Sequence, residues 1–132
     1  MKLLRQLRRD DTGSFAIEFA IALPVLIAMM IGILNFGLVL NANGSMRNAM
    51  GEGLRLAKVD PTATDASVIA ATRSALVGVD PNAVQVLTFA RGTSNNTETG
   101  AMTMSITLRP IIPFAEIPPI VLTETKQIYL PS

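Results

Sequence analysis

An α+β fold is predicted, in which a long N-terminal helix crosses a membrane and continues into a small domain with one short helix and about three antiparallel strands. Apolar residues concentrate in one run over 14–40, apolar residues at helical spacing follow it, and alternating segments lie towards the C-terminal end. We expect three regions: a basic leader over 1–13, a membrane helix over 14–40 and an extracytoplasmic domain over 41–132.

The composition excludes several classes of chemistry. The 132 residues include no cysteine and no histidine, and the net charge is +1. Disulfides, thiolate nucleophiles, zinc fingers and histidine relays are therefore excluded, and the balanced charge gives no global field that would attract nucleic acid. We expect a protein that is not an enzyme, with no catalytic residue, no cofactor and no metal.

The apolar run is long enough to span a bilayer. As a helix, residues 14–40 measure about 40 Å, against a hydrocarbon core of about 30 Å. A secretory signal has a shorter apolar stretch, of about 7–15 residues, and a soluble core helix would carry polar residues at helical spacing. The positive-inside rule places the leader in the cytoplasm and the domain across the membrane. The basic residues of the leader are Lys2, Arg5, Arg8 and Arg9.

The helix is predicted to continue past the membrane. Apolar residues recur every three to four positions over 46–57, as far as Asp60-Pro61, which ends the pattern. Gly51 and Gly53 should weaken this stretch, by about 1 kcal/mol each relative to alanine.

A short helix and three strands are expected in the rest of the domain. Thr64 or Asp65 can cap a helix over 66–76, which Gly78 ends. Alternating side chains predict strands over 84–89, 102–109 and 120–130, the last with the least regular alternation. Between the strands lie a polar, turn-rich segment over 92–100, which we expect to be the most exposed surface, and a proline-rich loop between Arg109 and Ile120.

One acidic residue lies inside the apolar run. Glu18 follows Gly13 by five positions, and a charge costs about 2.5–3.5 kcal/mol at the centre of an inserted helix and less towards an end. On one interpretation Glu18 lies one turn from the boundary and reaches the headgroups. On the other, an ionisable group within the membrane has a function and a partner.

The residues around Glu18 resemble the TadE family of pseudopilins, which belong to the tight-adherence (Flp-type IVb) pilus machinery. The segment Gly-Ser-Phe-Ala-Ile-Glu-Phe-Ala-Ile-Ala-Leu-Pro over 13–24 matches the family pattern of a glycine, a short gap, Glu-Phe-Ala, aliphatic residues, a proline and a long aliphatic run. The resemblance implies a pilin-like fold and cleavage by a prepilin peptidase after Gly13, which leaves Ser14 as the new N-terminus. It also implies assembly through Glu18, Phe19 and Pro24.

The resemblance further implies how the helix would assemble. In related pilins the new α-amino group pairs with the glutamate of a neighbouring subunit, here Glu18. The expected partners are the membrane, the peptidase, other pilin or pseudopilin subunits in a homo- or hetero-oligomer, and the pilus assembly platform. The expected location is the bacterial inner membrane, with a periplasmic domain and incorporation into an extracellular pilus as a further step.

Two alternatives stay open from the sequence. Asn35, late in the span, either donates a hydrogen bond to a neighbouring helix during assembly or lies at the wet outer interface. The chain as a whole is either a processed minor pilin or pseudopilin, or an unprocessed bitopic envelope protein whose periplasmic domain binds a partner.

Overall fold

The chain is built as a long helix, a short helix and a three-stranded sheet, which confirms the predicted α+β fold. The computed structural model describes residues 11–113 and 115–131, so most of the predicted leader lies outside the described residues. The elements are α2 (Asp11–Val59), α3 (Asp65–Ser74), the 3₁₀ turn η1 (Pro81–Ala83), β1 (Val84–Ser94), β2 (Thr97–Leu108) and β3 (Ile120–Tyr129).

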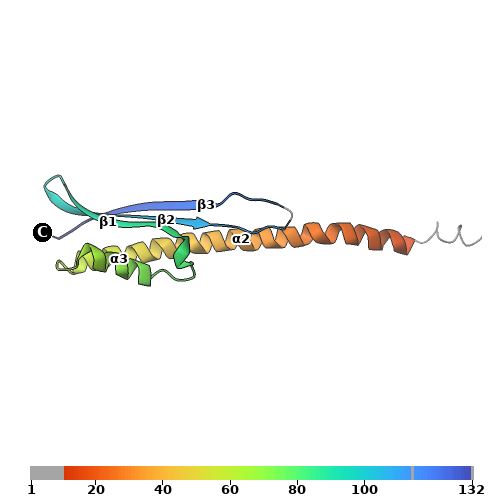
Figure 1. Cartoon of the computed structure of the whole chain (residues 1–132), viewed down its shortest axis with the longest axis horizontal. Helices are drawn as coiled ribbons and strands as arrows, with labels where there is room; N and C mark the ends of the chain where they lie inside the picture. Colours follow the sequence, from red (N-terminus) through yellow and green to blue (C-terminus); the bar gives the residue numbers. More distant parts are fainter. Residues whose placement is uncertain (1–10, 114, 132) are drawn as a thin grey trace, which may run out of the picture.

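Helix α2 has a C-terminal half that is packed and an N-terminal half that is not. Its 49 residues make a rod about 70 Å long, and Figure 1 shows the sheet and α3 packed along its C-terminal half while the N-terminal half extends beyond them. Pro24 lies inside α2 without ending it. The predicted continuation from the membrane run to the residue before Asp60 is therefore confirmed.

Helix α3 begins where the sequence predicts and ends earlier. Thr64 is the N-cap, and its Oγ1 accepts a hydrogen bond of 3.2 Å from the backbone N–H of Ser67. The helix ends at Ser74, two residues before the predicted end, because the chain turns back to α2: the backbone N–H of Val77 donates to Ser45 Oγ at 3.0 Å. Gly78 has a φ of +72°, which an L side chain rarely adopts.

The sheet has the order β1-β2-β3, and both pairs are antiparallel. The segment over 92–100 was expected to be turn-rich and the most exposed surface. Most of it is strand instead, and its exposed part ends at Glu98 because Thr99 and Gly100 are buried. Strands β1 and β2 remain paired as far as Ser94 and Thr97. Only Asn95 and Asn96 turn the chain, with φ values of 50° and 63°, as a two-residue hairpin with positive φ requires. The residues over 92–98 form an exposed ribbon that projects past the core, so their polarity reflects exposure rather than a loop.

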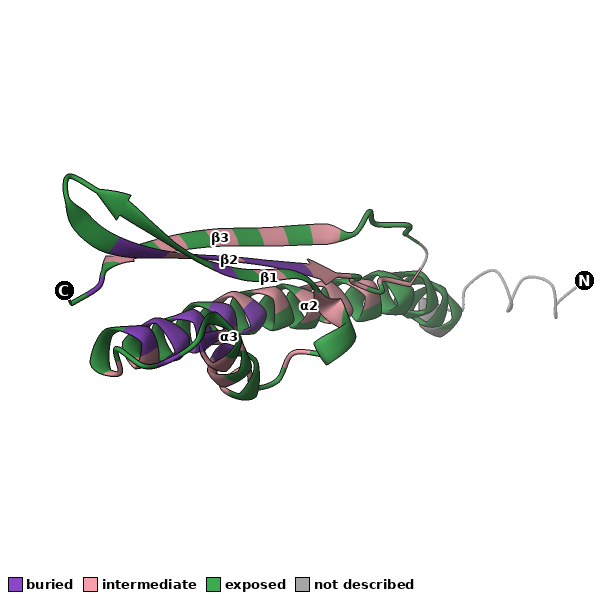
Figure 2. Ribbon diagram, turned by 60° about the vertical axis from the view of Figure 1, so that its left-hand side comes forward, coloured by how far each residue is buried: buried purple, intermediate pink, exposed green. Residues whose placement is uncertain are grey.

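The least regular strand in the sequence alternates cleanly in the structure. Every second residue of β3 faces α2, as the striped strand in Figure 2 shows. Two charged residues lie on this inner face because α2 offers them partners. Glu124 Oε2 lies 3.3 Å from Arg47 Nη2, and Lys126 Nζ donates to the Arg47 carbonyl at 3.0 Å.

The core lies between the C-terminal half of α2, α3 and the inner face of the sheet (Figure 2). Methionine supplies much of it, as flexible side chains fill irregular gaps. Gly53 has a specific role here, because a Cβ at this position would overlap Thr72 Oγ1 on α3. The prediction that Gly53 only weakens α2 was therefore incomplete. The largest fully buried side chains are Met46, Met50, Met102, Met104, Ile106, Val68 and Thr72.

Candidate functional site

The N-terminal half of α2 presents apolar side chains on all its sides. Ile17 and Phe19 lie on roughly opposite sides of the helix, because two residues turn a helix by about 200°, and their exposed fractions are 64% and 57%. The unburied stretch is continuous in Figure 2. A helix that is apolar all round requires lipid or a partner around it.

Within the described part of the chain, one helix is apolar and long enough to cross a membrane. Its span is Gly13–Val59, its most apolar 18-residue window has a mean hydropathy of 2.5, and none of that window is buried. Burial inside a soluble core, the usual alternative, does not account for this segment. The N-terminal half of α2 therefore has the length and the exposed apolar surface of a helix that could cross a membrane.

Gly13 and Ser14 lie in the first turn of α2. Apart from the neighbouring backbone of α2, no atom of the described residues lies within 4 Å of the point where a Cβ on Gly13 would stand, and its φ is not positive. Neither packing nor backbone conformation in the described part of the chain requires glycine at position 13. Any requirement for glycine there comes from outside the described fold.

Glu18 lies one helical turn after Ser14, on the same face of α2. It is the single charged residue in the run over 14–40, and its side chain is exposed. The ion pairs between described residues join Arg47 to Glu124, Arg55 to Glu52 and Arg91 to Asp65. The carboxylate of Glu18 is in none of them.

A shallow hollow follows the helix surface from Glu18. Its lining is apolar apart from the carboxylate, and the lining residues are spaced so that they share one face of α2. Such a face offers a neighbouring helix a surface to pack against, with the acidic group at one end. The lining residues are Glu18, Ile21, Ala22, Val25, Leu26 and Met29.

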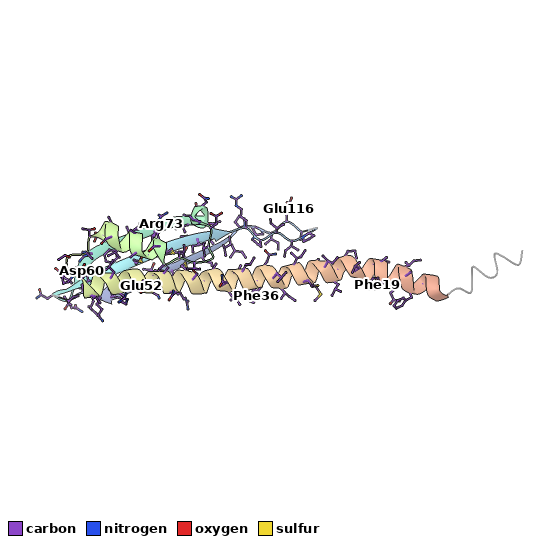
Figure 3. All side chains as sticks on the ribbon, turned by 90° about the horizontal axis from the view of Figure 1, so that it is seen from below. Phe19, Phe36, Glu52, Asp60, Arg73 and Glu116 are labelled. Atoms are coloured by element: carbon purple, nitrogen blue, oxygen red, sulfur yellow. The ribbon has the colours of Figure 1, made fainter. Side chains whose placement is uncertain are left out.

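Phe19 and Pro24 complete the predicted set in the first half of the run. Phe19 projects away from α2 without a covering element among the described residues, as the label in Figure 3 shows. Pro24 has no N–H, so the Ala20 carbonyl lacks its usual partner within the helix. Both residues are placed where a neighbouring helix or lipid could reach them.

Asn35 has a partner that the sequence did not predict. Its Nδ2 donates to the Ile31 carbonyl at 2.9 Å, one turn earlier, and to the Ile111 carbonyl at 3.0 Å. Ile111 belongs to the proline-rich loop, residues 109–119, which links β2 to β3. Both N–H groups of the amide are thus used within the chain, and a bond to a second helix would use the Oδ1 acceptor.

Comparison with known proteins found one segment of the chain that is similar to a family model. Residues 13–55 match the family model described as TadE-like protein. No curated protein and no solved structure gave a significant match to the chain. The matched segment starts at Gly13 and contains the whole apolar run, so the predicted resemblance is confirmed for the part of the chain that carries the candidate site.

Proposed function

We propose that the chain is a structural minor pilin or pseudopilin of the tight-adherence pilus system, because residues 13–55 match the TadE-like family model and the TadE resemblance implies that system. A prepilin peptidase cuts it between Gly13 and Ser14, and the N-terminal half of α2 then joins other subunits. The observation that supports the proposal best concerns Glu18. Its carboxylate is exposed, one turn after Ser14 on the proposed membrane helix, and it is in none of the ion pairs of the described residues.

The proposed orientation follows from the leader. The basic residues over 1–9 favour the cytoplasmic side, and acidic residues such as Asp10 and Asp11 contribute little to orientation. The domain is then periplasmic, anchored in the inner membrane of a bacterium, and the cleavage site lies at the cytoplasmic face. From this position the subunit can be drawn into an extracellular pilus.

Cleavage after Gly13 fits the surroundings of that residue. The site is in the first turn of α2, where backbone N–H groups lack helical acceptors, and glycine lowers helix stability by about 1 kcal/mol relative to alanine. Local unwinding towards a peptidase is therefore inexpensive. Because a side chain at position 13 meets nothing in the described chain, a substitution there should affect the peptidase and leave the fold intact.

Cleavage would create a partner for Glu18. A new α-amino group at Ser14 has an ordinary pKa of about 7.7–8.0, so it is mostly protonated at neutral pH. At a separation of about 4 Å and an effective dielectric constant near 20, it would attract a carboxylate by about 4 kcal/mol before desolvation is subtracted. The positive end of the helix dipole adds to this attraction.

The pairing would also set how neighbouring subunits align. Ser14 and Glu18 lie about 6 Å apart along the helix axis, so two parallel copies bring the amine of one level with the carboxylate of the other when they are offset by one turn. The apolar hollow beside Glu18 then faces the neighbouring helix. The Glu18 carboxylate, which is costly in lipid when it is unpaired, would thus favour a one-turn offset between neighbouring helices.

The first experiment measures processing. In the host, or with a prepilin peptidase co-expressed, the mature chain should begin at Ser14, and Gly13→Phe should remain uncut while its domain folds normally. N-terminal sequencing and intact mass give the answer. A mature wild-type chain that keeps residues 1–13 would refute processing and support the unprocessed bitopic protein.

The second experiment separates membrane insertion from assembly. Glu18→Ala should insert and be cut, but should fail to co-purify with the other pilus subunits. The matched control is Glu98→Ala, which removes an exposed carboxylate near the hairpin instead. Normal assembly by Glu18→Ala would remove the carboxylate from the mechanism.

A further inference from the structure

The proline-rich loop extends towards the membrane half of α2. Figures 1 and 3 show it reaching past the end of the sheet along the helix, with Glu116 labelled on it. One hydrogen bond holds it there, and one apolar side chain lies close to the helix. The Asn35 amide donates to the Ile111 carbonyl at 3.0 Å, and Ile112 Cδ1 lies 3.9 Å from the point where a Cβ on Gly32 would stand.

The loop is apolar and exposed. Ile111 is 80% exposed and Ile117 is 38% exposed, and the exposure of apolar side chains to water is unfavourable. Between positions 110 and 119 Glu116 is the single charged residue, and four of the ten residues are prolines. Proline has no backbone N–H, so the loop brings few donors that would need water.

The level of the loop along α2 coincides with the expected edge of the hydrocarbon. From Ser14 to Asn35 the helix rises about 30 Å, which equals the thickness of a typical hydrocarbon core. A helix that enters the bilayer near Ser14 therefore leaves the hydrocarbon near Asn35, on the side of the domain. Lipid-exposed irregular backbone is excluded from the hydrocarbon itself but tolerated at its edge.

We propose that the proline-rich loop lies in the membrane interface on the domain side, with Ile111 and Ile117 in contact with lipid. The Asn35 bond holds the loop at that level, the Glu116 carboxylate reaches the headgroup layer, and exposed Arg109 faces lipid phosphates. The loop is then a second membrane contact beside α2, and it limits the depth and the tilt of the helix. This inference rests on the membrane anchoring of α2 and not on cleavage or pilus assembly.

Lipid is favoured over a second protein chain as the partner of the loop, because the loop adjoins the membrane half of α2. The loop lies directly against a helix that is already in the bilayer, so lipid reaches Ile111 without any further association. Its missing N–H donors also suit an apolar surface better than a protein partner, which would supply acceptors for such donors.

The test uses tryptophan as a depth probe, because the chain contains none. Ile111→Trp and Ile117→Trp are prepared in the full chain and reconstituted in vesicles of phosphatidylethanolamine and phosphatidylglycerol, with and without bromine on the upper part of the acyl chains. Both substitutions leave the backbone bond to Asn35 available. The aqueous control is Val59→Trp, exposed at the far end of α2, and the lipid control is Met30→Trp, exposed in the apolar run.

The expected result is that brominated lipid strongly quenches the emission of Ile111→Trp and Ile117→Trp while aqueous iodide quenches it weakly, as for Met30→Trp. Val59→Trp should show the reverse. Two loop probes as open to iodide as Val59→Trp would overturn the proposal. So would lipid quenching that disappears as the protein-to-lipid ratio rises, since a second copy would then cover the loop. An unquenched Met30→Trp would show instead that α2 is not in the bilayer, and the inference would fall with its premise.

Discussion

Gly53 lies where α3 crosses α2, and the structure leaves no room there for a methyl group. A Cβ would overlap Thr72 Oγ1, and it would lie 3.0 Å from the Val68 carbonyl oxygen and 3.1 Å from Met102 Cε. The carbonyl belongs to the backbone and cannot rotate away. We therefore predict that Gly53→Ala destabilises the domain, although alanine is the better helix former.

The magnitude follows from three effects. Overpacking costs about 1–3 kcal/mol. Displacing the Thr72 hydroxyl breaks its 2.9 Å bond to the Val68 carbonyl, and a buried polar group left unpaired costs about 1–3 kcal/mol more. The higher helix propensity of alanine offsets about 1 kcal/mol of this loss in the free energy of unfolding. We expect a net loss of about 3 kcal/mol in the free energy of unfolding.

Gly51 provides a matched control in the same helix. Nothing lies within 4 Å of its Cβ position, so Gly51→Ala should stabilise the domain by up to about 1 kcal/mol. Urea unfolding of the full chain in detergent micelles, followed by circular dichroism and by amide exchange in β2, measures both variants. If Gly53→Ala is as stable as Gly51→Ala, the close crossing of α2 and α3 is wrong.

A double substitution tests the cause. Thr72→Ala removes the hydroxyl that obstructs the new methyl group, so Gly53→Ala with Thr72→Ala should cost less than the sum of the two single substitutions. Additive costs would show that the overlap with Thr72 is not what destabilises Gly53→Ala.

Three further predictions concern the cap, a turn and the loop. Thr64→Ala should cost about 1 kcal/mol, because it removes the acceptor for the Ser67 N–H; a stability unchanged in urea would contradict this. Two hydrogen bonds from Thr62 lower the pKa of Asp60, so stability from this turn is present above the ordinary pKa of about 3.9 and is lost as the pH falls through the lowered value. An NMR titration should show the Asp60 midpoint rising in Thr62→Ala. Asn35→Leu should accelerate amide exchange in the proline-rich loop and leave exchange in β2 unchanged.

Much of the fold could be predicted because its signals are local. The length of the apolar run over 14–40 by itself favours a membrane span over a signal or a core helix. Threonine is a favourable N-cap residue, and Thr64 is the N-cap of α3. The alternation over 102–108 corresponds to one buried face in the structure, with Met102, Met104 and Ile106 at 0% exposure.

The details that the sequence could not predict depend on partners that are remote along the chain. Glu124 and Lys126 disturb the apolar alternation of β3, yet they face inwards because Arg47 lies opposite. The polar residues over 92–98 gave no strand signal although they are mostly in paired strands, because strand residues outside the core need no apolar face.

The candidate site also divides into residues with a local sequence signal and residues whose partner is remote along the chain. Gly13, Ser14, Glu18, Phe19 and Pro24 could be proposed from the sequence because they lie in one contiguous segment that resembles the family pattern, and their roles in processing and assembly stay predictions. The bond between Asn35 and Ile111 joins residues 76 positions apart. An isolated amide in an apolar run, together with an apolar loop rich in proline elsewhere, was the signal that could have suggested it.

Helix α2 passes without a break from its exposed apolar half into the core, so no hinge separates the two halves. If the apolar half packs against a neighbouring helix as proposed, a shift of one residue along the helical screw moves the attached sheet by about 1.5 Å along the axis and rotates it by about 100° around that axis. Contacts of the apolar half would then decide which side of the sheet meets a partner of the domain. The spacing of neighbouring domains and the direction in which they face would therefore change together.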